Sequence, residues 1–513
     1  MARILNNSAD INGGRVLLLL LLFIIAIYGF INSGFTFFSI IISIPILIFL
    51  IVIAFKNGML TFWTLICINY VLQWKISPLP SGIPMSLYNE LLEIILIALA
   101  AIDTQNTKFE RCGNIMFLTL IVWCGYCTLE VLNDTCGMGL DIGAWYGSAR
   151  MMAFQLMYAF IVFTIYISDP KILTKYLVIW GAISLFASIW AFKQKYIGFT
   201  TEENIFLQGR GRSTHLLQAG TLIRYWSIYS DAANFGIGIA STAVAFLIFG
   251  ITNKIKKQKY FFIIVSVACI WAMFLSGTRT AIACLMAGLG SYIFLSKSFK
   301  IAVPFTISFI LFICFLAFTN IGNGNQQIRR MRSAFNRNDA SAGARSVNQA
   351  AMKKYMSEAP WGIGLQIGYQ NAPVNNKYTF MAKVPPDSEY VFIWIHTGII
   401  GITTFLICTG LMLIGACWIV LFKLKNPSLR GIGAGFCCAF VSQQLGGYGN
   451  QVLMQFPNAL VFYGGLAIVF VLPHIENEWI EYETNKLSKQ EEKKRLRKEQ
   501  QEKSRIKGLL GWT

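Results

Sequence analysis

Two carboxylates stand where a long polar stretch of the chain gives way to an apolar one. Residues 385–401 read PPDSEYVFIWIHTGIIG, so Asp387 and Glu389 come directly before a run of apolar side chains. A carboxylate can take a proton from a hydroxyl group as a general base, and partial burial strengthens it in that role. The alternative role is structural, since an acid in the first turn stabilises a helix. We expect Asp387, or Glu389 if the geometry favours it, to be a catalytic base.

Arginines stand in three separate segments that could face these acids. Arg279 lies in LSGTRT, residues 275–280, Arg345 lies in a long basic stretch, and Arg224 precedes an apolar run. Guanidinium groups hold phosphates and carboxylates through planar paired contacts. We expect Arg279 and Arg345 to be catalytic and Arg224 to bind substrate. The alternatives are that Arg279 snorkels to a membrane interface and that Arg345 is a solvated surface charge.

Further polar side chains near these segments are candidate substrate-binding residues. We expect this group to comprise Ser276, Thr278, Asn234, Arg329, Arg332 and His396. Asp231 is a suitable N-cap for the helix that holds Asn234. His396 follows Glu389 by seven residues and so falls on roughly the same helical face, although a packed histidine is the alternative. No cluster of histidine, cysteine and carboxylate residues has metal-ligand spacing, so no metal site is expected.

The elements that must position these residues are membrane-spanning helices. The chain has 513 residues, of which 55% are hydrophobic and 13% charged. Apolar runs of about 17 to 25 residues recur along it, and each is long enough to cross a bilayer as a helix. The fold class expected is an all-α, polytopic transmembrane bundle of about 14 spans. The predicted spans are 16–32, 35–54, 58–74, 87–102, 114–132, 149–168, 173–192, 230–250, 259–277, 280–296, 301–319, 399–422, 431–448 and 456–473.

The charge distribution predicts the orientation of this bundle. The formal net charge is +19, and lysines and arginines gather in alternate short loops and at both termini. The positive-inside rule then places both termini in the cytoplasm. The chain divides into a transmembrane part, 1–473, which contains a long outer loop at 320–386, and a charged cytoplasmic tail, 474–513. The loop should contain a helix that ends before Pro360 and packs through an apolar face at Val347, Ala350, Ala351, Tyr355 and Met356.

Four sequence features between residues 220 and 420 carry a resemblance to a known family. They are the SDAAN segment at 230–234 after Arg224, the SGTR segment at 276–279, the long loop with Arg345 and PWGIG at 360–364, and Asp387-Ser388 followed after nine residues by GIIG at 398–401. In this order they resemble the bacterial O-antigen ligase and O-antigen polymerase superfamily of C-type glycosyltransferases. Ligases of that family carry histidine at the position of Asp387, and this departure favours the polymerase branch.

The resemblance implies a reaction and its partners. The donor would be an undecaprenyl-diphosphate-linked oligosaccharide, and an acceptor glycan hydroxyl would attack its anomeric carbon with inversion at the periplasmic face of the bacterial inner membrane. The product would be polymerised surface polysaccharide, either O-antigen or capsule. Arginines would stabilise the departing diphosphate, so no metal or cofactor is required. Membrane lipids and a chain-length regulator or other polysaccharide-assembly proteins are the further partners expected, and nucleic acid is not one.

Two other functions stay open at this point. An O-antigen ligase would transfer the glycan to lipid A core, and a lipid-linked glycan flippase or other transporter would change no covalent bond. A transporter should show inverted repeats or charges near the middle of the bilayer. No internal repeat is visible in the sequence.

Overall fold

The structure of the chain is a computed structural model. It describes residues 20–21, 23–24, 27–28, 57–75, 86–209, 216–218, 222–297, 340–368, 371–374, 376–384 and 386–509, with single residues and short pieces between 303 and 332. Residues 1–61 and 62–513 form two units, and every candidate site residue belongs to the second. The expected spans at 16–32 and 35–54 lie almost wholly outside the described residues, and the span at 301–319 lies partly outside them.

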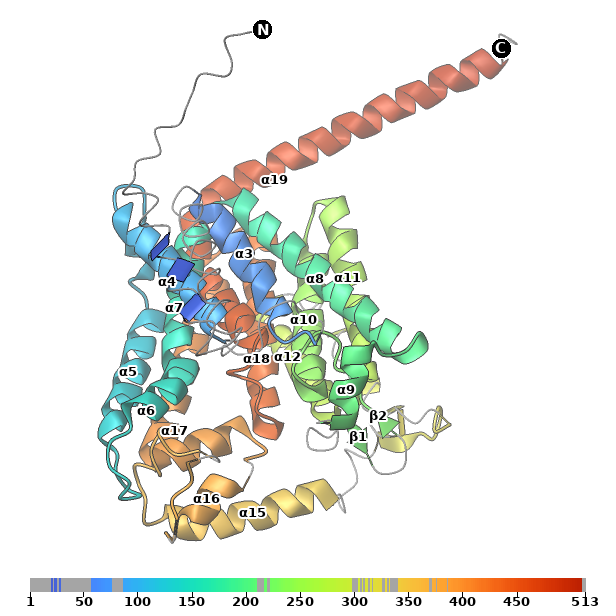
Figure 1. Ribbon diagram of the computed structural model, residues 1–513. Coiled ribbons are helices and arrows are strands. Elements are labelled where there is room, and N and C mark those ends of the chain that lie inside the picture. Colours follow the sequence, from blue (N-terminus) through green and yellow to red (C-terminus); the bar gives the residue numbers. More distant parts are fainter. Residues whose placement is uncertain are drawn as a thin grey trace, which may run out of the picture. The chain divides into compact units, whose positions relative to one another are not determined.

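The described part of the chain is built almost entirely of helices, as the apolar runs predict (Figure 1). A small antiparallel pair of strands, β1 (Leu217–Gln218) and β2 (Leu222–Ile223), is the exception among the described elements. The helices are α3 (Gly58–Val71), α4 (Ser86–Ile102), η1 (Phe109–Cys112), α5 (Ile115–Leu129), η2 (Glu130–Leu132), α6 (Ile142–Ala149), η3 (Arg150–Phe154), α7 (Gln155–Tyr166), α8 (Pro170–Tyr196), α9 (Thr201–Gly209), α10 (Ala232–Thr252), α11 (Lys256–Leu275), α12 (Arg279–Leu295), α15 (Ala340–Met356), α16 (Thr379–Lys383), α17 (Glu389–Trp418), η5 (Ile419–Lys423), α18 (Pro427–Gly449) and α19 (Asn458–Leu509).

Seven of the described helices are long and apolar enough to cross a membrane. They are Ile115–Leu132, Ile142–Tyr166, Pro170–Tyr196, Ala232–Thr252, Lys256–Leu275, Glu389–Lys423 and Asn458–Lys503. Two shorter apolar helices, Gly58–Val71 and Arg279–Leu295, also coincide with predicted spans. The chain is therefore an all-α integral membrane protein, although the described residues give seven candidate spans and not the fourteen or so expected.

Small residues let the central helices α10, α12 and α18 approach closely. A methyl group added at Gly288 of α12 would stand 2.8 Å from a methyl of Val244 in α10 and 3.1 Å from the carbonyl oxygen of Cys438 in α18. Close backbone approach of this kind is the usual basis of helix packing in membranes. It fixes the relative positions of the helix ends that carry the candidate site.

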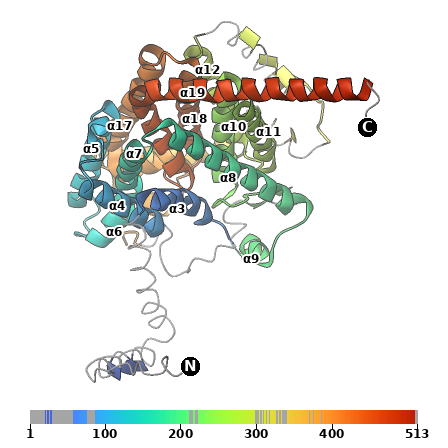
Figure 2. The same cartoon turned by 90° about the horizontal axis from the view of Figure 1, so that it is seen from above.

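The two ends of this bundle differ in what they carry. Helices α15 and α16 lie at the lower end in Figure 1, near the start of α17. We call this the site end, and define it by residues 275–280, 386–389 and 446–457. At the other end α19 continues without interruption through Pro473 to Leu509, so the charged tail prolongs the last span. Figure 1 shows its C-terminal part rising away from the other helix ends, and Figure 2 shows it extending beyond α11.

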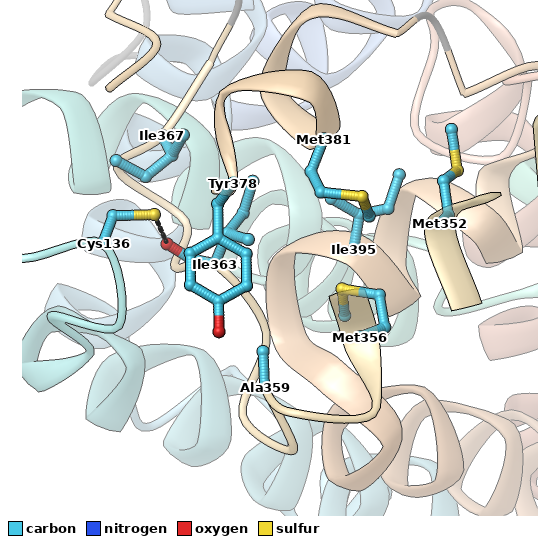
Figure 3. Close-up of a cluster of buried hydrophobic side chains, with 9 residues drawn as sticks. All are labelled: Cys136, Met352, Met356, Ala359, Ile363, Ile367, Tyr378, Met381 and Ile395. Atoms are coloured by element: carbon cyan, nitrogen blue, oxygen red, sulfur yellow. Dashed lines mark hydrogen bonds between the residues drawn. The ribbon is translucent and has the colours of Figure 1, made fainter. Parts of the chain in front are cut away.

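The helix expected in the long loop is present as α15, but its buried face differs from the prediction. Met352 and Met356 pack with Met381 of α16 and Ile395 of α17 in a compact cluster (Figure 3). Tyr355 is partly buried against this cluster, whereas Val347 is 68% exposed. The first apolar positions stay outside because only the last two turns of α15 meet α16 and α17.

Candidate functional site

The segment joining α11 to α12 binds Arg224. The Nε atom of Arg224 donates to the carbonyl oxygen of Ser276 at 3.2 Å, and its Nη2 donates to Thr278 Oγ1 at 2.8 Å. The Thr278 hydroxyl in turn donates to the carbonyl of Ala232, the first residue of α10, at 2.7 Å. Arg224 is only 9% exposed. The structure thus brings together Arg224, Ser276 and Thr278, which the sequence offered as separate candidates.

Arg279 follows this segment as the first residue of α12 and is half-buried. A cation at a helix N-terminus faces the positive end of the helix dipole, so helix stability does not explain its position. The next residue, Thr280, accepts a hydrogen bond of 3.2 Å from the side-chain amide of Asn450, which caps the C-terminus of α18. Arg279 therefore lies beside the last turn of α18.

The segment that contains Asp387 also contacts the last turn of α18. Its neighbour Ser388, the N-cap of α17, donates a hydrogen bond of 3.0 Å to the carbonyl oxygen of Gly447. Asp387 itself is exposed. Gly447 and Asn450 are three residues apart, close to one turn of helix. Asp387 and Arg279 are therefore each adjacent in sequence to a residue, Ser388 or Thr280, that is bonded to the C-terminal end of α18.

Glu389 has a different environment from Asp387. It is 3% exposed, and its Oε2 accepts a hydrogen bond of 3.0 Å from the backbone amide of Leu453. Glu389 is thus occupied in holding the connection between α18 and α19, residues 450–457, which we call the 450–457 turn.

Other helices hold the same turn. The side chain of Asn234 donates to the carbonyl of Phe456 at 2.7 Å, and the side chain of Asn69 in α3 donates to that of Pro457 at 3.1 Å. Asn458 donates to the carbonyl of Asn234 at 3.0 Å. Asp231 caps α10 as the sequence predicted, accepting from the amides of residues 233 and 234 at 2.7 and 2.9 Å. Asn234 therefore fixes the turn beside the site.

The PWGIG segment docks on a break in α17. Gly398 has φ 66° and ψ −168°, a backbone conformation found almost only in glycine. The amides of Ile363 and Gly364 donate to the carbonyls of residues 395 and 396 at 2.9 and 3.0 Å, and the amide of Ile400 donates to that of Pro360 at 3.3 Å. A methyl group on Gly398 would overlap the carbonyl of Pro360. The glycine in the sequence motif is thus needed for this contact.

His396 is a packed histidine at this junction. It is 8% exposed, its Nδ1 lies 3.1 Å from the carbonyl oxygen of Gly364, and its ring packs on Phe392 at 4.4 Å between centroids. The packing role that the sequence left as an alternative is therefore the one the structure shows.

The connection between η2 and α6 fastens the long loop to the bundle. The side chain of Asn133 donates to the carbonyl of Trp361 at 2.9 Å, and Gln366 donates to that of Gly139 at 3.0 Å. The side chain of Asn376 donates to the carbonyl of Cys136 at 2.8 Å. Segments more than 220 residues apart in sequence are therefore joined at the site end.

The loop arginines differ in what they contact. Arg332 donates to Asn323 Oδ1 at 2.7 Å and to the carbonyl of Ile321 at 2.6 Å, so it holds its own segment. Arg329 is exposed. Arg345 belongs to α15, seven residues before Met352, so the helical register places both on the same side of that helix. The side chain of Arg345 lies outside what the structure describes.

Sequence reasoning missed a buried ion pair between α4 and η3. Arg150 Nη1 lies 2.8 Å from Glu90 Oε2, and the hydroxyl of Tyr146 donates to Glu90 Oε1 at 2.9 Å. Arg150 Nη2 also donates to Ser86 Oγ at 2.8 Å. A signal was available, because charged residues inside apolar runs are uncommon and usually paired. We refer to this feature as the Glu90–Arg150 pair.

A second missed acid organises the segment after α8. Glu203 accepts hydrogen bonds from the side chains of Gln194, Trp190 and Lys193 at 2.7, 2.8 and 3.1 Å, and from the amide of Thr200 at 2.9 Å. Burial by itself raises the pKa of Glu203, but these hydrogen bonds outweigh it and leave the pKa below its usual value. The acid holds α9 against the end of α8.

The sequence that forms this arrangement matches a known protein family. Residues 264–406 match the family described as O-antigen ligase. The matched segment contains Arg279, α15, the PWGIG segment and Asp387. A search of the curated proteins found no match to the chain.

Proposed function

We propose that this chain, whose residues 264–406 form an O-antigen ligase family domain, is a glycosyltransferase that polymerises surface polysaccharide repeat units. It would transfer a glycan from undecaprenyl diphosphate to an acceptor sugar hydroxyl with inversion. The observation that carries the proposal is that the neighbours of Asp387 and Arg279 both bond the C-terminal end of α18, where Ser388 bonds Gly447 and Thr280 bonds Asn450.

Arginines supply the donor side of this site. As the bond between the anomeric carbon and the phosphate oxygen breaks, the electron pair stays on the diphosphate. Arg279 stabilises that charge, and Arg224 orients the segment around it through Ser276 and Thr278. Arg345 is the third cation, delivered by α15. Fixed positive groups that need no rearrangement during the reaction are the largest source of such stabilisation.

Asp387 supplies the acceptor side. The acceptor hydroxyl oxygen forms the new bond to the anomeric carbon, and its proton passes to the Asp387 carboxylate late in the step. The geometry favours Asp387 over Glu389 as the base, because Asp387 is exposed whereas the Glu389 carboxylate accepts backbone hydrogen bonds. A carboxylate is a weak base toward a sugar hydroxyl, which suits proton transfer that follows bond formation.

We assign the site end to the periplasm and the opposite end to the cytoplasm of a bacterial inner membrane. Basic residues gather at that opposite end. Lys254 pairs with Glu483 of α19 at 3.5 Å, and the backbone amides of Lys425 and Asn426 donate to Glu476 at 2.7 and 2.6 Å. A basic cytoplasmic side is what the positive-inside rule requires.

Incubation of the purified protein with lipid-linked repeat units tests the proposal. Lipid-linked chains longer than one repeat are expected, and Arg279→Ala should abolish them while the protein still accumulates. Transfer to an added lipid A core would identify the ligase reaction, the second candidate, which the family match favours. Recovery of the donor with no covalent change would contradict both and favour a transporter.

Two neighbouring acids provide a matched comparison in this assay. Asp387→Asn should abolish transfer and lower the melting temperature less than a change at the buried Glu389, because Asp387 is exposed. Glu389→Gln should lower the melting temperature, because one carboxylate oxygen that faces backbone amides is replaced by an NH₂ donor. Normal chain lengths from the Asp387→Asn protein would remove this residue from the mechanism.

A further inference from the structure

The C-terminal part of α19 is fixed to the bundle by one face. Ile475, Trp479 and Glu483 are spaced four residues apart and are 0%, 1% and 4% exposed. Glu483 accepts hydrogen bonds from Ser428 Oγ at 2.6 Å and from the Asn426 side chain at 3.0 Å. These contacts join α19 to the start of α18 and set the rotation of the helix about its own axis.

Beyond Glu483 the helix leaves the bundle, and none of its described side chains up to Lys503 is buried. We call residues 484–503 the arm. Figures 1 and 2 show it continuing as one straight helix past α11. Because the rotation is fixed at Glu483, each later position faces a direction that helical geometry determines.

The buried face becomes a basic face along the arm. Lys486, Gln490 and Arg497 come 3, 7 and 14 residues after Glu483, so they continue the line of Ile475 and Trp479. Lys489 and Lys494 flank this line on either side. The face that packs on the bundle thus becomes, beyond the bundle, a cationic face turned in the same direction.

The opposite side of the arm is acidic. It carries Glu491, Glu492, Glu499 and Glu502. Arg495 and Lys503 also fall on this side, and the Nε of Arg495 donates to Glu499 at 3.0 Å, four residues on. Charges of the two signs are therefore segregated, with the basic side toward the bundle and its surrounding membrane and the acidic side away from both.

We propose that the basic face of the arm binds the headgroups of anionic phospholipids in the leaflet beside the bundle. Lipid surrounds the bundle at this end. The negative headgroups of anionic lipids complement the charges of Lys486, Lys489, Lys494 and Arg497. Clusters of four or more basic residues next to a membrane span bind such surfaces electrostatically. The glutamates face water and repel the same surface, so only one rotation of the arm is favourable.

The full-length protein in lipid nanodiscs that hold one copy tests this inference. The exposed Cys67 and Cys314 are first replaced by serine, and a fluorescent label is then attached at Gln490→Cys or at Ser488→Cys. By helical register the first label lies on the basic face and the second on the opposite side. Nitroxide-headgroup lipid should quench the label at 490 more than the label at 488 in phosphatidylglycerol discs. The difference should vanish in phosphatidylcholine discs and shrink at high salt.

Charge-matched variants distinguish an effect of the basic face from an effect of the total charge of the arm. Lys486→Gln with Arg497→Gln should lower the ratio of docked to undocked arm about 30-fold, because each basic residue near an anionic surface changes it about fivefold. Arg495→Gln with Lys503→Gln removes the same charge from the other side and should change the ratio much less. Equal quenching of the two labels, or equal quenching in both lipids, would overturn the inference. Quenching differences confined to discs with two copies would assign the face to a second chain instead.

Discussion

Replacing Gly398 with alanine should dismantle the junction between the long loop and α17. At φ 66° and ψ −168° an L-residue is strained by about 1–3 kcal/mol. The added methyl group would also overlap the carbonyl of Pro360 and crowd the amide of Gly362. Both are backbone atoms, so no side-chain rotation relieves the overlap.

The magnitude depends on the contacts that must separate. Three backbone hydrogen bonds hold the PWGIG segment to residues 395–400, and each contributes about 0.5–1.5 kcal/mol. Adding the backbone strain gives a loss of roughly 3–7 kcal/mol of local stability. Trp361 would also lose its stacking on Tyr126, which now has 5.9 Å between ring centroids. Since Asp387 comes two residues before the start of α17, glycan transfer should fall with the loss of this junction.

Gly410 provides the control in the same helix. A methyl group there would meet nothing within 4 Å, so Gly410→Ala should leave the fold intact or stabilise α17 by up to about 1 kcal/mol. The assay is thermal unfolding of both purified variants, with limited proteolysis of residues 360–384 and chain elongation measured alongside. Equal melting temperatures and equal chain lengths for the two variants would refute the reasoning.

Two further predictions concern the buried acids that the sequence did not single out. Glu90→Leu should destabilise the protein by about 3–5 kcal/mol, because it leaves Arg150 buried without its partner, whereas adding Arg150→Met should restore most of the loss. Single and double variants with the same melting temperature would contradict this. Glu203→Gln should lower the melting temperature at pH 7. Because the folded pKa of Glu203 lies below the unfolded value of about 4.3, the difference from wild type should shrink as the pH falls below about 4, and a difference constant from pH 7 to 3 would argue against it.

Features encoded locally could be predicted from the sequence. Apolar runs long enough to cross a bilayer correspond to α5, α8, α10 and α11, because such runs satisfy their backbone hydrogen bonds only as helices. The capping role of Asp231 depends on residues two and three positions away, so it too was predicted. Arg224, Ser276 and Thr278 were each predicted as site residues, but the hydrogen bonds that join them were not.

Features that depend on distant pairing were not predictable. Glu389 was a candidate base, yet its carboxylate meets the amide of Leu453, which is 64 residues away. The buried face of α15 is set by where α16 and α17 touch it, so spacing alone selected Val347 wrongly. The Glu90–Arg150 pair spans 60 residues, and neither residue on its own identifies its partner.

The non-helical backbone at Gly398 divides α17 into two helical pieces that have different contacts. Residues 399–418 continue the helix beyond it, whereas residues 389–397 pack through Ile395 with α15 and α16. The start of this first piece is also bonded to the bundle, because Ser388 donates to Gly447 of α18 and Glu389 accepts from Leu453. Residues 388–397 therefore connect α15 and α16 directly to the transmembrane helices beside Asp387.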